Sequence, residues 1–248
     1  MSNLIEGRNP VLEALRSGRT IGKIWLAKNC ARHGAIAEII HIARTKNILI
    51  EYVEPSAINR LSETRASQGV IAFASAKDYV DLDTLLSISQ TRGEPAIYLI
   101  LDGIEDPHNL GAILRTADAA GLHGVIVRER RAVGLTPAVE KAAAGALEYV
   151  AVAKVVNIAQ TIVTLKQNNI WIVGIDQAGD INYRLLDYRP PTAIVIGGEG
   201  QGLSELVKKR CDFLACIPMR GHIASLNASV AAGIVMYEAV KQREARGA

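Results

Sequence analysis

Short, almost continuously apolar runs rich in β-branched residues alternate with helix-like runs along the whole chain. Runs of this kind are typical of strands that are covered on both faces. The runs predicted as strands are 23–27, 48–53, 70–74, 96–101, 124–127, 170–175, 193–197 and 214–218. The main runs predicted as helices are 34–46, 107–120, 157–168 and 203–210. This alternation predicts an α/β fold with a mostly parallel sheet.

The alternation is interrupted between residues 75 and 95. This stretch carries acidic residues, a short helix-like segment around Leu82–Ser89 and an Arg-Gly-Glu-Pro turn. Polar stretches with turn residues commonly separate domains. We therefore predict a small N-terminal domain over 1–75, a linker over 76–93 and a larger C-terminal domain over 94–248.

Positive charge is concentrated in the N-terminal third. Residues 1–77 hold 11 Lys and Arg against 6 Asp and Glu, whereas the rest of the chain holds 17 against 19. Such asymmetry is expected of a module that contacts a polyanion, although a solvated basic surface without a partner explains it equally. The candidate contacts are Arg8, Arg16, Arg19, Lys23, Lys28 and Arg32.

Three features bear on where the protein works. The longest apolar run is well short of the ~18 residues that a membrane span needs, and the first ten residues lack the apolar stretch of a signal peptide. The three cysteines are odd in number and fit no CxxC pattern, so we interpret them as free thiols in a reducing cytosol. We expect a cytoplasmic protein with no membrane segment and no metal; Cys211 and Cys216 as a ligand pair is the alternative.

The stretch LDGIEDPHNLGAILRTADAAG, residues 101–121, is the first that could carry chemistry. A predicted strand ends at Leu101, and a helix follows for which Asn109 is a good N-cap. Asn109 and Arg115 can both face the carboxyl end of that strand, where open α/β sheets bind ligands. The alternative is structural: a capping asparagine and an Arg115–Asp118 ion pair.

The stretch IGGEGQGLS, residues 196–204, is rich in glycine but is not a phosphate-binding loop. A P-loop would need Lys where this chain has Leu203, and the glycines do not have the GxGxxG spacing. Glu199 would repel a phosphate, but it suits a hydroxyl, an amine or an arginine. These features count against a nucleotide-dependent oxidoreductase.

The third stretch is CIPMRGHIASLNASVAAGIVMYEAV, residues 216–240. A predicted strand ends in Ile217-Pro218-Met219, and Ser225 is a plausible N-cap for the following helix. Ser225 and Asn227 would then stand at a helix N-terminus beside the glycine loop. The alternative is a simple cap on a helix whose small residues allow close packing.

Together and in this order, the three stretches resemble the motifs of the SPOUT superfamily, in its branch of RNA ribose 2′-O-methyltransferases. The first motif has an Asn and an Arg six residues apart, the second a glycine-flanked Glu, and the third Ile-Pro-Met followed by Ser-Leu-Asn. The resemblance covers about 96–243. The start IEGRNPVLEAL is similar to the accessory RNA-binding domain of the members that act on large-subunit ribosomal RNA.

The resemblance implies a fold, a cofactor and a set of site residues. The fold would be a small N-terminal α/β/α RNA-binding domain followed by a SPOUT domain with a parallel sheet and a deep trefoil knot. The cofactor would be S-adenosylmethionine. The implied cofactor-binding residues are Gly197, Ile217, Met219 and Leu226, and the implied catalytic residues are Asn109, Arg115, Glu199, Ser225 and Asn227.

Arg115 is the residue expected to act on the ribose hydroxyl. A guanidinium is a poor free base, so it would clamp the neighbouring phosphate and stabilise the developing alkoxide, or take the proton itself. Asn109 would orient Arg115 or the ribose, and Ser225 and Asn227 would position the hydroxyl or its phosphate.

The resemblance also implies partners. The expected substrate is RNA, with a guanosine of 23S ribosomal RNA favoured and a transfer RNA ribose second. A homodimer that shares active-site residues is implied as well. A non-catalytic RNA-binding factor in ribosome assembly is the remaining alternative.

Overall fold

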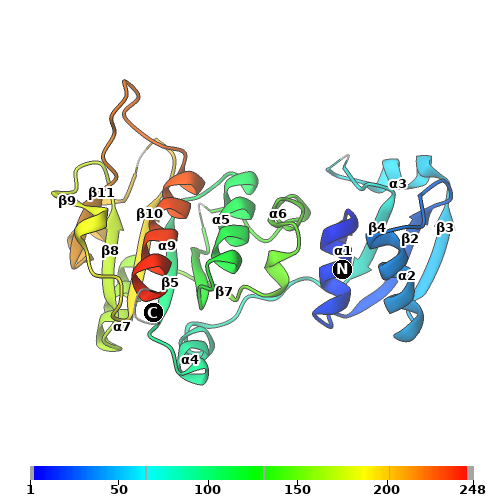
Figure 1. Cartoon of the computed structure of the whole chain (residues 1–248), viewed down its shortest axis with the longest axis horizontal. Coiled ribbons are helices and arrows are strands. Elements are labelled where there is room, and N and C mark those ends of the chain that lie inside the picture. The colour runs from blue at the N-terminus through cyan, green and yellow to red at the C-terminus, as the bar shows by residue number, and fades with distance from the viewer. Residues whose placement is uncertain (1–2, 65, 131, 201, 245–248) are drawn as a thin grey trace. The chain divides into compact units, whose positions relative to one another are not determined.

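The computed structural model describes residues 3–64, 66–130, 132–200 and 202–244. The chain forms two compact units, each described by itself below (Figure 1). The first contains the chain up to Asp78 together with Gly134–Tyr149. The second contains Tyr79–Val133 and the chain from Val150 onward.

The first unit is built on a four-stranded sheet in the order β1-β4-β2-β3. Its strands are β1 Asn3–Glu6, β2 Ile21–Ala27, β3 Leu49–Val53 and β4 Val70–Ala74. β4 runs antiparallel to β1 and β2, whereas β2 and β3 are parallel. Helices α1 Arg8–Arg16 and α2 Ala35–Thr45 pack on one face, and α3 Pro55–Leu61 packs on the other. The expected α/β/α layers are therefore present, but the sheet in this unit is mixed.

A segment from later in the chain completes the first unit. It contains α6 Pro137–Ala143 and the 3-10 turn η1 Ala146–Glu148, which pack against β1 and α1. The Arg19 guanidinium lies 3.1 Å from the Glu140 carboxylate and 2.8 Å from that of Glu148, and all three side chains are at most 5% exposed. Arg19 is thus a buried structural residue, which removes it from the candidate RNA contacts.

The second unit is built on a seven-stranded sheet in which all strand pairs are parallel, in the order β7-β6-β5-β10-β8-β11-β9. Its strands are β5 Ile97–Asp102, β6 Gly124–Arg128, β7 Val152–Val155, β8 Trp171–Ile175, β9 Ile181–Asn182, β10 Thr192–Gly197 and β11 Phe213–Cys216. The parallel sheet predicted from the buried apolar runs is confirmed here. The predicted strand 214–218 ends two residues earlier, at Cys216.

Helices cover both faces of this sheet (Figure 1). The core on one face includes residues of α4 Leu82–Arg92, α7 Ile158–Gln167 and α8 Glu205–Arg210. On the other face, α5 Pro107–Ala119 packs against α9 Ala228–Glu244, with α9 also against β10. A 3-10 turn, η2, spans Tyr183–Leu185. α4 lies in the stretch predicted as a linker, and its Leu85 is fully buried in the core.

Two neighbouring side chains fix the far end of α9. Gln242 accepts a hydrogen bond from the Tyr188 amide at 3.0 Å and donates one to the Leu186 carbonyl at 3.1 Å. The Arg243 guanidinium donates hydrogen bonds to four backbone carbonyls, those of Tyr188, Pro95, Ala96 and Pro190, at 2.6–3.0 Å. These carbonyls belong to the segments that lead into β5 and β10. The last helix is therefore tied to the two central strands at its far end. Among the described residues, no helix is long and apolar enough to span a membrane.

Candidate functional site

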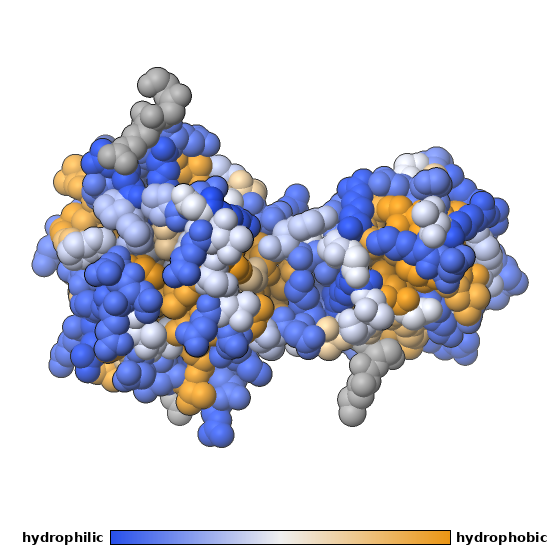
Figure 2. Space-filling model, turned by 90° about the horizontal axis from the view of Figure 1, so that it is seen from below, coloured by the Kyte–Doolittle hydropathy of each residue, from blue (hydrophilic) through white to orange (hydrophobic). Residues whose placement is uncertain are grey.

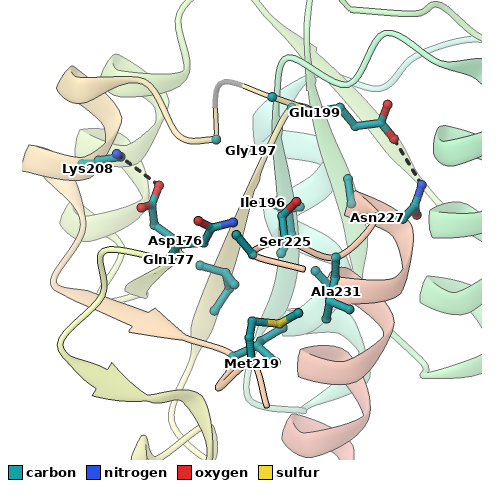
Figure 3. Close-up of a pocket in the computed structure, with 18 residues that line it drawn as sticks. Asp176, Gln177, Ile196, Gly197, Glu199, Lys208, Met219, Ser225, Asn227 and Ala231 are labelled. Atoms are coloured by element: carbon teal, nitrogen blue, oxygen red, sulfur yellow. Dashed lines mark hydrogen bonds and ion pairs between the residues drawn. The ribbon is translucent and has the colours of Figure 1, made fainter. Parts of the chain in front are cut away.

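A cavity of about 490 Å³ lies at the carboxyl ends of β8 and β10. Its walls come from the residues after β8, the glycine loop after β10, the segment after β11 and the first turns of α9 (Figure 3). Open α/β sheets bind ligands at this edge because the loops after parallel strands converge there. Two of the three sequence stretches singled out above, 196–204 and 216–240, supply three of the four walls. The remaining stretch, 101–121, begins at the neighbouring strand β5.

The glycine loop is folded so tightly at Gly197 and Gly198 that no side chain would fit at these two positions. A Cβ on Gly197 would lie 2.1 Å from the carbonyl carbon of Gly202, and one on Gly198 would lie 2.2 Å from the Gly103 oxygen. Gly200 and Gly202 have φ values of +81° and +62°, a region that favours glycine. The glycines therefore allow the loop to double back against the end of β5, and in doing so they form the wall of the cavity.

Two carboxylates hold the far end of this loop. Asp102, at the end of β5, accepts a hydrogen bond from the Ser204 amide at 3.0 Å, and Asp176, after β8, accepts one from the Leu203 amide at 3.4 Å. Asp176 also accepts from the Ala178 amide at 3.0 Å and lies 3.2 Å from the Lys208 ammonium.

The environment of Asp176 favours its charged form. Burial alone would raise the pKa of this carboxyl. The Ala178 and Leu203 amides and the Lys208 ammonium outweigh burial, so the pKa of Asp176 is lowered. Asp176 reciprocally raises the pKa of Lys208 through their hydrogen bond. The wall of the cavity thus carries a carboxylate that stays ionised.

A second polar cluster stands at the other side of the cavity. The Asn109 amide donates to Oε1 of Glu199, and the Asn227 amide donates to the same oxygen at 3.1 Å and to the Asn109 oxygen at 2.9 Å. Figure 3 shows Glu199 and Asn227 facing one another across this side. Asn109 precedes Glu199 by 90 residues and Asn227 by 118 residues. The fold therefore brings these side chains together from distant parts of the chain.

The caps of the two helices differ from those predicted. The N-cap of α5 is Asp106, which accepts from the His108 amide at 2.8 Å, and Asn109 lies in the first turn. For α9, Asn227 accepts from the Ser229 and Val230 amides, so Asn227 rather than Ser225 caps this helix. An Asp and an Asn are both strong caps, and the sequence alone did not show which of several polar residues would bond to the helix.

The structure brings most of the predicted site residues to one place. Asn109 reaches the site through Glu199 and Asn227. The predicted residues that line the cavity are Gly197, Glu199, Ile217, Met219, Ser225, Leu226 and Asn227. Arg115 is the exception, because it is exposed on α5, outside the cavity lining, and makes no hydrogen bond or ion pair within the described residues.

Four functional candidates were missed from the sequence. Asp176, Gln177 and Lys208 line the cavity, and Asp102 holds its loop. Asp102 and Asp176 each stand at or just after the end of a predicted strand, which is the one signal that could have singled them out. Lys208 carried no signal, because a basic residue in the last turn of a helix is ordinary.

The chemistry of the site follows from these contacts. The apolar side chains of Ile175, Ile196, Ile217 and Leu226 line the cavity together with the carboxylates of Asp176 and Glu199. Such a site fits a ligand with an apolar ring and a positive or hydroxyl-bearing part, and it disfavours a phosphate. No group of three or more His, Cys, Asp or Glu side chains in the described part of the chain could hold a metal. The fold and site define an α/β protein that binds a small molecule beside a hydrogen-bonding cluster.

Comparison with known proteins identifies the family. The pattern of the SpoU rRNA Methylase family matches residues 96–237, and the pattern described as RNA 2′-O ribose methyltransferase substrate binding matches residues 4–80. The chain therefore belongs to the SpoU rRNA methylase family, a family of RNA methyltransferases.

Individual relatives agree with this assignment. A Bacillus subtilis protein that bears the name of the TrmH family of tRNA/rRNA methyltransferases, YacO, is 45% identical over 97% of this chain and 96% of its own. A protein of the same family name from Staphylococcus saprophyticus is 48% identical with the same coverage. The SpoU methyltransferase AviRb from Streptomyces viridochromogenes, solved in complex with AdoMet, is similar in structure with a TM-score of 0.83. It is 26% identical, and the match covers 98% of this chain and 91% of that one.

Proposed function

We propose that this protein transfers a methyl group from S-adenosylmethionine to a ribose 2′-hydroxyl in RNA, most favourably a guanosine of 23S ribosomal RNA. The observation that carries the proposal is the cavity itself, a glycine-walled pocket with carboxylates instead of phosphate ligands, bordered by the Asn109–Glu199–Asn227 cluster. The relatives described above include a methyltransferase solved with this cofactor.

The residues present fit this cofactor. Ile217 and Leu226 would contact its adenine, with Met219 beside them, and the backbone of Gly197 would lie against it. The ionised Asp176 suits the hydroxyls or the amine of the cofactor. When bound, the cofactor supplies a methyl group on a positively charged sulfur.

The polar cluster would orient the ribose. Oε1 of Glu199 accepts from both asparagines, and Oε2 makes no hydrogen bond within the described residues. Oε2 is therefore free to accept a hydrogen bond from a hydroxyl at the mouth of the cavity. Ser225, on the exposed segment before α9, would contact the nucleotide there.

Arg115 would act on the RNA rather than on the cofactor. The 2′-oxygen must lose its proton as it attacks, and a nearby cation stabilises the negative charge that develops. Because Arg115 is exposed and outside the cavity lining, we assign it to the phosphate next to the target ribose. It would reach that phosphate within one chain or across the interface of a homodimer.

The exposed apolar residues of α9 support a homodimer. Val230 and Tyr237 are 49% and 51% exposed, and they are seven residues apart, so they share one side of the helix. We further propose the threaded, knotted path of the family and a role in ribosomal RNA processing. The three cysteines are free thiols, which supports a reducing, cytoplasmic location.

The substrate test is methyl transfer from tritiated S-adenosylmethionine to unmodified 23S ribosomal RNA and transfer RNA in parallel. Label in 23S RNA at an alkali-resistant linkage is the expected result. Label in transfer RNA alone would make the protein a transfer RNA methyltransferase. No label in free RNA or in precursor ribosomal particles, together with no cofactor binding, would favour a non-catalytic assembly factor.

A further inference from the structure

A second surface of the catalytic unit lies at the opposite edge of the sheet from the cofactor cavity. α7 leads into β8 and α8 leads into β11, so both helices end beside the amino ends of these strands. Ile175 at the other end of β8 lines the cavity. Trp171 and Ile175 are four positions apart in β8, so at ~3.3 Å per residue this surface is about 13 Å from the cavity.

An exposed aromatic pair forms one half of this surface. The ring centroids of Trp171 and Phe213 are 5.5 Å apart, with an interplanar angle of 37°. Trp171 is 49% exposed, although the next three residues of its strand are buried. Because half of the indole stays in water, Trp171 contributes much less to folding stability than a fully buried indole would. The exposed half of the indole is therefore open to a stacking partner.

A basic groove forms the other half. It has a volume of about 380 Å³ and is lined by Val163, Lys166, Gln167, Lys209 and Arg210. Lys166 lies 2.6 Å from Asp212, whereas Lys209 and Arg210 are exposed and make no ion pair within the described residues. A cation in the last turn of a helix stabilises that helix modestly. This stabilisation does not explain why three cations surround one groove.

Asp212 joins the two halves. Its carboxylate accepts from the Lys166 ammonium and, at 2.9 Å, from the Ile172 amide, the residue after Trp171. Asp212 also precedes Phe213, and Lys166 donates to the Arg210 carbonyl at 3.3 Å. The groove and the aromatic pair are thus held against one another. Figure 2 views this side of the second unit, where the described apolar residues (orange) reach the surface between hydrophilic ones (blue).

We infer that the Trp171–Phe213 pair and the groove of Lys166, Lys209 and Arg210 form a second RNA-binding surface, which holds an unpaired stretch of the substrate. This inference rests on the proposed function, since the RNA must be a substrate of the chain. Cations that track a phosphate backbone beside an aromatic face on which a base stacks are the features of single-strand recognition. A base-paired segment would satisfy the cations but would not present a free base to Trp171.

The first test uses the fact that the chain has two tryptophans, Trp25 and Trp171. In the full-length Trp25→Phe variant, Trp171 is the sole indole. Titration with an oligouridylate of about a dozen nucleotides, within the usual range of single-strand sites, should quench its fluorescence. A duplex of the same length should not. Equal fluorescence with and without the single strand would overturn the inference, and Trp171→Phe reports whether Trp25 contributes a signal.

The second test removes charge from the groove. Lys209→Gln combined with Arg210→Gln should weaken binding of unmodified 23S RNA about tenfold or more and flatten its salt dependence. The matched control, Arg92→Gln with Lys241→Gln, removes two exposed cations from the last turns of α4 and α9 and should bind RNA as the wild type does. Affinity for S-adenosylmethionine, measured by calorimetry, should be unchanged in both variants, which shows that the chain is folded.

The outcomes separate the two proposals. If the wild type transfers no methyl group to any RNA, the proposed function fails. If it transfers methyl groups while the groove variant binds RNA as tightly as its control, the second surface is wrong. In that case the exposed Trp171 is better explained as part of a surface that binds another protein.

Discussion

Asn227 shows how one amide can both cap a helix and join a polar cluster. Its oxygen caps α9 by accepting from the Ser229 and Val230 amides, while its nitrogen donates to Asn109 and Glu199. A substitution that keeps the oxygen but removes the donor should separate the two roles. Aspartate does this, because it is as good a cap as asparagine.

We expect Asn227→Asp to keep the capping contribution to stability and to lower methyl transfer at least tenfold. The new carboxylate cannot donate to Asn109, and it stands beside the Glu199 carboxylate. Asn227→Ala should lower both properties, with a loss of about 1 kcal/mol of stability from the missing cap. Thermal unfolding and the tritium assay check this, and an active Asn227→Asp variant would contradict it.

Asp176 should make stability depend on acid pH. The pKa of Asp176 is lowered in the folded chain. Its contribution to the free energy of unfolding is therefore complete above the ordinary aspartate pKa of about 3.9. This contribution is lost as the pH falls through the lower pKa of the folded chain. Asp176→Asn should therefore be less stable than the wild type at neutral pH, and the difference should shrink below about pH 4. Urea unfolding without cofactor across this range measures it.

Asp180→Asn is the control for this prediction. Asp180 is exposed, is four residues away and makes no hydrogen bond or ion pair within the described ranges. Its variant should match the wild type at each pH. A constant difference between Asp176→Asn and the wild type down to the lowest pH would show that the Asp176 contacts do not depend on its charge.

At the scale of the element, a single glycine-to-alanine substitution tests whether the cavity depends on the tight fold of the glycine loop. A Cβ on Gly197 would strike the backbone of Gly202, whereas one on Gly221 would meet nothing within 4 Å. We expect Gly197→Ala to lose measurable S-adenosylmethionine binding and Gly221→Ala to keep it. Calorimetric titration compares them, and equal affinities would show that the loop can open without harm to the cavity.

The elements also show what could be predicted from the sequence. Strands such as β5 and β10 are buried on both faces, so their apolar runs were unambiguous. β1, β7 and β9 were missed because they are short, with four, four and two residues, and β7 is interrupted by the exposed Lys154. β9 is defined by its pairing with β11, which local composition does not contain. The candidate site residues were predicted from their motifs, whereas Asp102 and Asp176 became evident only from the folded loop that they hold.

At the scale of the whole molecule, the chain passes between the two units three times, after Asp78, after Val133 and after Tyr149. The sequence predicted a single passage, over 76–93. Segment 134–149 could not be assigned from its composition, because its partners, β1 and α1, are more than a hundred residues away. The buried ion pairs of Arg19 with Glu140 and Glu148 stabilise this long-range packing.

Removing the N-terminal part of the first unit, up to Asp78, should therefore expose the later segment that completes this unit. A chain that begins at Tyr79 keeps α6 and η1 but loses the surface that buries Val139, Ala143 and Leu147. We expect it to bind a hydrophobic dye and to scatter light. A version in which 134–149 is replaced by a short Gly-Ser linker should do neither. Equal dye binding by the two truncated proteins would show that the segment does not need the first unit.

The position of α9 has a consequence for synthesis. This last helix supplies Asn227 and Ala231 to the cavity, and Arg243 ties its far end to the segments before β5 and β10. Earlier strands can collapse as they emerge from the ribosome, since chains fold from the N-terminal side. The cavity, however, lacks one of its walls until α9 has been made and anchored. A nascent chain therefore cannot complete this cavity until α9 has left the ribosome and Arg243 has reached its carbonyl partners.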